Sequence, residues 1–180
     1  MTTLDQSLPS KLITAASTKL TNESDALSAL DAVAGDGDHG VNMAAAFSDA
    51  VRRLTEEPPA NLAAAFRSTS KAFHNTAGGA SGALLGSFFS TAAKALEEIE
   101  EPSTSDVVNA LDRGAARLVA VGSSKLGQKT MVDALLPAVV AAKLVAGDGA
   151  DLGAAMSAAA DAASRGAEAT ATMHPTAGRA

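Results

Sequence analysis

Apolar residues recur along most of this chain at intervals of three and four, the spacing that places them on one face of an α-helix. Eight stretches carry the pattern: residues 8–20, 27–34, 43–54, 62–73, 85–99, 107–118, 132–140 and 152–163. No segment alternates between apolar and polar residues as a half-buried strand does. The sequence therefore predicts an all-α protein of eight or nine helices.

Several of the predicted boundaries carry helix start or stop signals. Ser103 and Asp106 have the spacing of a capping box, and so do Thr130 and Asp133. Prolines at positions 58, 59 and 102 mark the ends of preceding helices. These signals agree with the boundaries that the apolar pattern gives.

The connections between predicted helices are mostly short, which favours antiparallel neighbours. We therefore expect one domain over residues 1–180, a bundle or barrel of about eight antiparallel helices. Pro137 falls inside a predicted helix and should distort it locally, because proline has no backbone donor.

The composition excludes several kinds of functional site and partner. The 180 residues include no cysteine, so disulfides, thiolate metal sites and a cysteine nucleophile are excluded. The formal charge of −6 argues against a nucleic-acid partner, and an acidic chain that binds polyphosphate needs a divalent metal. No run approaches the roughly 18 to 20 apolar residues that span a bilayer. We expect a soluble, cytoplasmic protein with no membrane segment.

An acidic, glycine-rich segment interrupts the helical pattern at residues 35–40, GDGDHG. Asp36 and Asp38 can point to one place, and Asp31 lies near the end of the preceding helix, where it could supply a third carboxylate. Carboxylate oxygens suit Mg²⁺, Mn²⁺ or Ca²⁺. An EF-hand is excluded because its twelfth loop position, counted from Asp36, is Phe47. An ordinary surface turn is the alternative, since Asp and Gly are common in turns.

The helix predicted to begin near Val41 or Asn42 would direct its free amides at the same place, which favours a bound anion. Metal and anion together are typical of a nucleotide phosphate site. His39 is either an incidental loop residue or a group that contacts phosphate.

Two further polar segments are candidates for phosphate or nucleoside contacts. Residues 78–82, GGASG, precede a helix but match neither a Walker A loop nor a Rossmann fingerprint, and a flexible connection explains them equally well. Residues 122–130 end in Lys129 and Thr130, before Met131. Lys129 is either a cation near phosphate or a solvated side chain, and Met131 is either a surface for a base or core packing.

Taken together, the three segments resemble one known family. The order and spacing of residues 30–43, 78–82 and 127–138 are similar to the L subunit of dihydroxyacetone kinase, and the match spans nearly the whole chain. The resemblance implies a barrel of eight antiparallel helices with an ADP or ATP site at one end.

The resemblance also implies site residues. Asp31, Asp36 and Asp38 would hold two Mg²⁺ ions, and His39 would contact the migrating phosphoryl group. The remaining nucleotide contacts would come from Gly40, Val41, Asn42, Gly79, Ala80, Ser81, Gly122, Lys129, Thr130, Met131 and Arg179.

In this family the keto sugar is held by a separate K subunit. The phosphoryl donor is either a phosphotransferase-system M subunit acting on tightly held ADP, or exchangeable ATP as in related ketose and tetrose kinases. A nucleotide-sensing module that does no chemistry is a further alternative. Two departures stand out: Gln128 replaces the usual Asp, and the sequence stops at Ala180, before the family's C-terminal tail. We therefore expect the part of the site that binds the nucleoside to be more open to solvent than in other members of the family.

Overall fold

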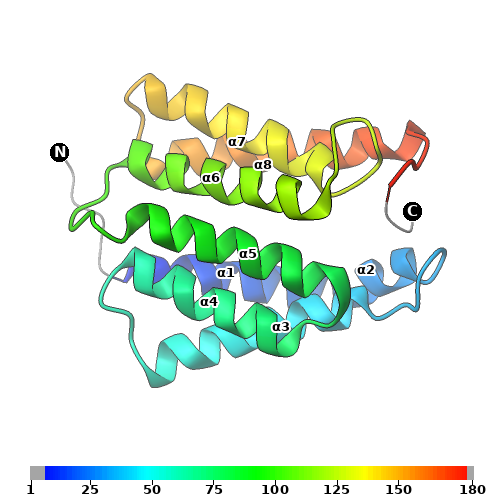
Figure 1. Cartoon of the computed structure of the whole chain (residues 1–180), viewed down its shortest axis with the longest axis horizontal. Helices are drawn as coiled ribbons and strands as arrows, with labels where there is room; N and C mark the ends of the chain where they lie inside the picture. The colour runs from blue at the N-terminus through cyan, green and yellow to red at the C-terminus, as the bar shows by residue number, and fades with distance from the viewer. Residues whose placement is uncertain (1–6, 178–180) are drawn as a thin grey trace.

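The computed structural model describes residues 7–177. In that range it contains eight α-helices, one short 3₁₀ helix and no strand, as the sequence predicts (Figure 1). The elements are α1 (Leu8–Asn22), α2 (Ser24–Asp31), α3 (His39–Glu56), α4 (Leu62–Thr76), α5 (Gly79–Leu96), α6 (Thr104–Gly122), α7 (Val132–Gly147), α8 (Leu152–Ala169) and η1 (Thr170–Thr172).

The helices from α3 to α8 form an up-and-down arrangement in which each packs against the next in the chain. Both α1 and α2 pack against α3. The connections α2–α3, α4–α5 and α6–α7 lie at one end of the bundle, on the right in Figure 1. We call this the acidic end, because residues 31–38 lie there. The predicted site segments are thus brought to one end by the alternating helix direction.

The core is built from small residues and a phenylalanine cluster. Phe47, Phe73 and Phe89, from α3, α4 and α5, have ring centroids 5.0 to 6.3 Å apart, and Phe66 and Phe88 extend the group. Aromatic pairs in edge-to-face or stacked arrangements contribute roughly 0.5–1.5 kcal/mol each beyond the area that they bury. Fully buried alanines, including Ala46 and Ala92, let neighbouring helix axes approach closely. This core fixes the positions of α3, α4 and α5 relative to one another.

The predicted capping box at the start of α6 is confirmed. The Ser103 hydroxyl accepts the Asp106 amide at 3.2 Å, and the Asp106 carboxylate accepts the Ser103 amide at 2.9 Å. Hydrogen bonds from the Ser103 side chain and backbone hold the pKa of Asp106 below its usual value. This reciprocal pair satisfies amides that the first helical turn leaves free.

The second predicted box is only half right. Asp133 accepts the Thr130 amide at 2.9 Å, but the Thr130 hydroxyl accepts the Val132 amide rather than that of Asp133. The helix begins at Val132 with Met131 as its N-cap, so Thr130 lies one position too early to be the cap.

Helix α7 continues through Pro137. Proline cannot donate to the carbonyl four residues earlier, which belongs to Asp133. That carbonyl faces Gly166 of α8, where an added Cβ would lie 2.3 Å from the oxygen. The two helices therefore meet backbone to backbone at this point.

None of the described helices combines the length and apolar composition that a bilayer span requires.

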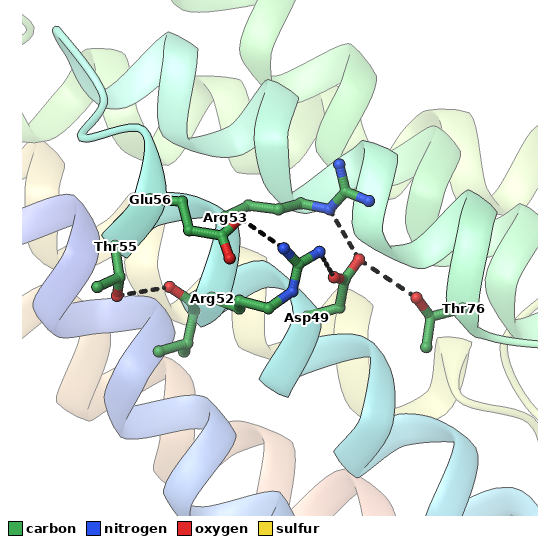
Figure 2. Close-up of polar contacts among 7 residues, drawn as sticks. Asp49, Arg52, Arg53, Thr55, Glu56 and Thr76 are labelled. Atoms are coloured by element: carbon green, nitrogen blue, oxygen red, sulfur yellow. Dashed lines mark hydrogen bonds and ion pairs between the residues drawn. The ribbon is translucent and has the colours of Figure 1, made fainter.

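An ion-pair network on α3 ties that helix to the end of α4 (Figure 2). The Asp49 carboxylate accepts the Arg53 Nε at 2.7 Å, the Arg52 guanidinium at 2.5 Å and the Thr76 hydroxyl at 3.3 Å. Burial by itself would raise the pKa of Asp49, but the hydrogen bonds and charges of Arg53 and Arg52 outweigh it and lower the pKa.

This network should make stability depend on pH in the acid range. Because the folded pKa of Asp49 is lowered, its contribution is complete above the unfolded value near 3.9 and is lost as pH falls through the folded pKa. Asp49→Asn should cost about 1 kcal/mol of unfolding free energy at pH 6 and progressively less below pH 4. Urea unfolding of both proteins at pH 6 and pH 3 measures this. An equal cost at both pH values would contradict it, and Asp161→Asn, on the exposed face of α8, is the control.

Candidate functional site

The structure brings the three predicted carboxylates together. Asp31 is the last residue of α2, and Asp36 and Asp38 follow in the connection to α3. One oxygen from each side chain lies within 4.8 Å of the others. The Gly37 amide donates to Asp31 Oδ2 at 2.8 Å, and Gly37 has a φ of +76°, which glycine adopts without the penalty of a Cβ. The loop thus folds around the Asp31 carboxylate.

A similar sequence at the opposite end of the bundle lacks this arrangement. Residues 147–151, GDGAD, join α7 to α8. There Asp151 caps α8 by accepting the Ala154 amide at 2.8 Å. Within residues 7–177, Asp31, Asp36 and Asp38 are the group of three whose ligand atoms come close enough to share one ion. A gathering of Asp and Gly does not by itself produce such a cluster.

Helix α3 begins at His39, earlier than the Val41 or Asn42 expected from the sequence. Glycine at position 40 lowers intrinsic helix propensity, but it also allows close contact between helices, because an added Cβ would lie 1.9 Å from the Ser24 carbonyl oxygen of α2. His39, Gly40 and Val41 therefore form the first helical turn. Asp38, the N-cap, makes no capping hydrogen bond with its side chain, which leaves its carboxylate directed to the cluster.

Helix α5 also begins earlier than expected. Gly79, Ala80 and Ser81 form its first turn rather than a loop, and extended Gly78 precedes them as a cap without a side chain. The glycine-rich sequence suggested a loop, yet first-turn residues need no helical acceptor for their amides. The backbone amides of this turn open towards the acidic end.

The starts of α3 and α5 differ in their capping from the starts of α4, α6 and α8. At the opposite end, Asn61, Ser103 and Asp151 cap α4, α6 and α8 with their own side chains. At the acidic end, neither α3 nor α5 has a side-chain cap. A helix N-terminus carries roughly half a positive charge and free amides, so two uncapped starts beside three carboxylates fit an anion that is bound together with a cation.

The connection 123–131 contains the late candidate residues. Ser123 and Lys129 have left-handed backbone angles, with φ of 50° and 59°. The Gln128 side chain accepts the Lys125 amide at 2.7 Å, so the residue that replaces the family's Asp keeps an acceptor inside the loop. Asp133, only 3% exposed, accepts the Gly127 amide at 2.5 Å and the Thr130 amide at 2.9 Å. Sequence reasoning treated Asp133 as a helix cap and missed this bracing role.

Of the predicted nucleoside residues, Gly122 and Met131 lie at the same end of the bundle. Gly122 ends α6, with the Leu84 side chain 3.3 Å from where its Cβ would be. Met131 is 38% exposed and so is not core packing. Arg179 lies outside the described residues.

A cavity of about 500 Å³ lies elsewhere, at the α3–α4 connection. Its lining includes Arg53, Asn61, Arg67 and Lys71, and it contains none of the predicted site residues. Acidic neighbours offset its cations: Arg67, for example, pairs with Glu97 at 2.8 Å. The geometry therefore favours the acidic end as the functional site.

Comparison with known proteins shows the family of this chain. Residues 33–180 match the DAK2 domain family. The ADP-binding subunit of the PEP-dependent dihydroxyacetone kinase of Escherichia coli is 31% identical over 88% of this chain and 75% of its own length. The ADP-binding subunit of PEP-dependent dihydroxyacetone kinase 1 of Listeria innocua is 36% identical over 63% of this chain, which spans 57% of that protein.

A solved structure is similar as well. The dihydroxyacetone kinase from C. freundii in complex with AMP-PNP and Mg²⁺ superposes with a TM-score of 0.78 and 32% identity, over 96% of this chain and 30% of that one. The resemblance predicted from the sequence motifs is thus confirmed by sequence and by fold. The chain belongs to the DAK2 domain family, together with the ADP-binding subunits of dihydroxyacetone kinases.

Proposed function

We propose that this chain is the nucleotide-binding subunit of a dihydroxyacetone-type kinase. It would hold ADP or ATP through Mg²⁺ and pass a phosphoryl group to a keto sugar on a separate K subunit. The observation that carries this proposal is the meeting of Asp31, Asp36 and Asp38 beside the uncapped start of α3. The family membership and the AMP-PNP and Mg²⁺ in the C. freundii complex support it.

The donor set fits magnesium. Three carboxylates supply hard oxygen ligands, the sequence has no cysteine, and the group of possible metal ligands found among residues 7–177 includes no histidine that would favour zinc or copper. When bound, Mg²⁺ would neutralise charge on the diphosphate and on the transferring group. The metal would be held by Asp31, Asp36 and Asp38, and we propose that the site takes two Mg²⁺ ions.

The protein's own groups would position the phosphates. The amides of His39, Gly40 and Val41 open at the start of α3, and those of Gly79 and Ala80 open at the start of α5. Asn42 and Ser81 could add side-chain contacts in the same two turns. Phosphoryl transfer depends mainly on placement and charge stabilisation, so two rigid helix starts suit it.

His39 should matter more for transfer than for binding. It begins α3, directly after the N-cap Asp38 of the metal cluster. If its imidazole contacts the migrating phosphoryl group, His39→Ala should slow transfer by roughly 10²-fold or more while changing ADP affinity by only a few fold. Single-turnover transfer and ADP calorimetry on the same preparation measure the two effects. Equal losses in both would make His39 a binding residue only, and exposed His74→Ala is the matched control.

Exposed apolar side chains around the acidic end support a protein partner there. Leu30 is 72% exposed, Val33 85%, Val41 59% and Leu126 58%. Neighbouring exposed apolar residues commonly mark an interaction surface. A K subunit seated here would bring its substrate to the nucleotide phosphates and exclude water from them.

The phosphoryl donor can be decided on the purified protein. Retained ADP, detected by native mass spectrometry, would favour rephosphorylation in place by an M subunit, whereas an empty or exchangeable site would favour free ATP. Incubation with K subunit, dihydroxyacetone and each donor would then test transfer. If neither donor yields sugar phosphate and Mg²⁺–ADP does not bind, the proposed function is wrong. Binding without transfer would instead indicate a nucleotide-sensing role.

A further inference from the structure

We infer that Asp133 is a positioning residue for the nucleotide site, acting through the 123–131 connection rather than by touching the ligand. The inference rests on the proposed function, because it assumes that this connection lies against a bound nucleoside. Asp133 belongs to the first turn of α7 and is only 3% exposed. A carboxyl group at such a depth requires internal hydrogen-bond partners.

Both oxygens of the Asp133 carboxylate are used inside the connection. Oδ1 accepts the Gly127 amide at 2.5 Å, and Oδ2 accepts the Thr130 amide at 2.9 Å. The two bonds clamp the segment 127–130 at both ends.

The clamp spans an unfavourable backbone conformation. Between the two bonded amides, Lys129 has a φ of 59°, in the left-handed region that is unfavourable for a non-glycine residue. The surrounding loop contributes little packing, since Leu126 is 58% exposed and nothing lies within 4 Å of a Cβ built on Gly127. Asp133 is thus the group that compensates the strain and fixes the course of the backbone to Lys129 and Thr130.

The C-terminal segment around Thr176 contacts the same part of the connection. The Thr176 amide donates to the Gln128 carbonyl at 3.4 Å, and Gln128 lies between the two residues that Asp133 holds. Loss of the clamp would therefore release both the connection and its contact with the C-terminal segment.

The test compares Asp133→Asn with Asp106→Asn. Asp106 is also a first-turn aspartate that accepts a backbone amide, but it lies at the opposite end of the bundle. An amide side chain offers one acceptor instead of two. Asp133→Asn should accelerate hydrogen exchange of the Gly127 and Thr130 amides and weaken Mg²⁺–ADP binding by roughly tenfold, measured well below the melting temperature. Asp106→Asn should change neither.

A second variant keeps the test valid if Asp133→Asn does not fold. Gly127→Ala adds only a methyl group on an exposed loop, where φ is +84° and the Cβ meets no atom, so it strains the clamped conformation without disturbing the core. It should weaken ADP binding several-fold and leave the melting temperature within a few degrees of the wild type.

The outcomes separate this inference from the proposed function. If wild type binds Mg²⁺–ADP and neither Asp133→Asn nor Gly127→Ala weakens it, Asp133 is not a positioning residue and the proposed function stands. If wild type does not bind Mg²⁺–ADP, the proposed function fails and the inference falls with it. Faster exchange at Gly127 and Thr130 without loss of affinity would reduce Asp133 to a structural role and overturn the inference.

Discussion

Substituting Asp36 or Asp38 with Asn should abolish magnesium-dependent nucleotide binding while leaving the helical bundle intact. Each change removes one anionic oxygen ligand from a cluster whose atoms lie within 4.8 Å, and both side chains are exposed, so the core loses no contact. We expect the Kd for Mg²⁺–ADP to rise by roughly 100-fold or more. Isothermal calorimetry with and without Mg²⁺ measures this, and the far-UV circular dichroism spectrum should not change.

The chain provides a matched control for these variants. Asp148 lies between Gly147 and Gly149 at the opposite end, as Asp36 lies between Gly35 and Gly37, but it belongs to no three-carboxylate group among the described residues. Asp148→Asn should bind Mg²⁺–ADP as wild type does. Unchanged affinity in both Asp36→Asn and Asp38→Asn would eliminate the metal site.

Asp31 should behave differently from the other two. It is half-buried and also accepts the Gly37 amide at 2.8 Å, so it shapes the loop as well as facing the cluster. Asp31→Asn should therefore weaken Mg²⁺–ADP binding and also lower the melting temperature slightly, which the variants at exposed positions should not do.

The sequence was sufficient for the fold class and for the grouping of the site segments. Helical spacing of apolar residues identified the helices, and short connections implied alternating directions. Alternation places the α2–α3, α4–α5 and α6–α7 connections at one end, which is where the structure has them. Asp36 and Asp38 were recognisable because a third carboxylate, Asp31, occurred at the end of the preceding helix.

The starts of α3 and α5 were harder to predict. Glycines at positions 40, 79 and 82 suggested loops, yet all three lie within helices. At position 40 glycine is needed because a Cβ would collide with the Ser24 carbonyl oxygen of α2. Helix propensity describes only the local sequence and cannot predict this tertiary contact.

The role of Asp133 was beyond sequence reasoning for a related reason. Its spacing from Thr130 suggested a capping box, and one of the two expected bonds exists. The second bond, to Gly127, depends on how residues 123–131 turn back, which no local pattern specifies. Gly166 was also not recognisable, because it lies in an alanine-rich helix and nothing in the local sequence indicates its contact with the Asp133 carbonyl.

Gly166→Ala should be the most destabilising single methyl addition in the α7–α8 contact. The new Cβ would lie 2.3 Å from the Asp133 carbonyl oxygen and 2.9 Å from the Ala134 Cα. Both neighbours are backbone atoms, so the helices must separate rather than a side chain rotate. Overpacking of this kind costs typically 1–3 kcal/mol and occasionally more, and we expect about 3 kcal/mol here.

The matched control is Gly147→Ala, at the end of α7, where nothing lies within 4 Å of the added Cβ. Alanine has the higher helix propensity, so this control should be neutral or stabilising by up to about 1 kcal/mol. For a chain of this size, the loss in Gly166→Ala corresponds to a melting temperature lower by roughly 6 to 12 °C. Thermal unfolding followed by circular dichroism decides the matter. If both variants have the melting temperature of the wild type, α7 and α8 do not meet backbone to backbone at Asp133 and Gly166. The Asp133 carbonyl, which Pro137 leaves without a helical donor, must then face something other than Gly166.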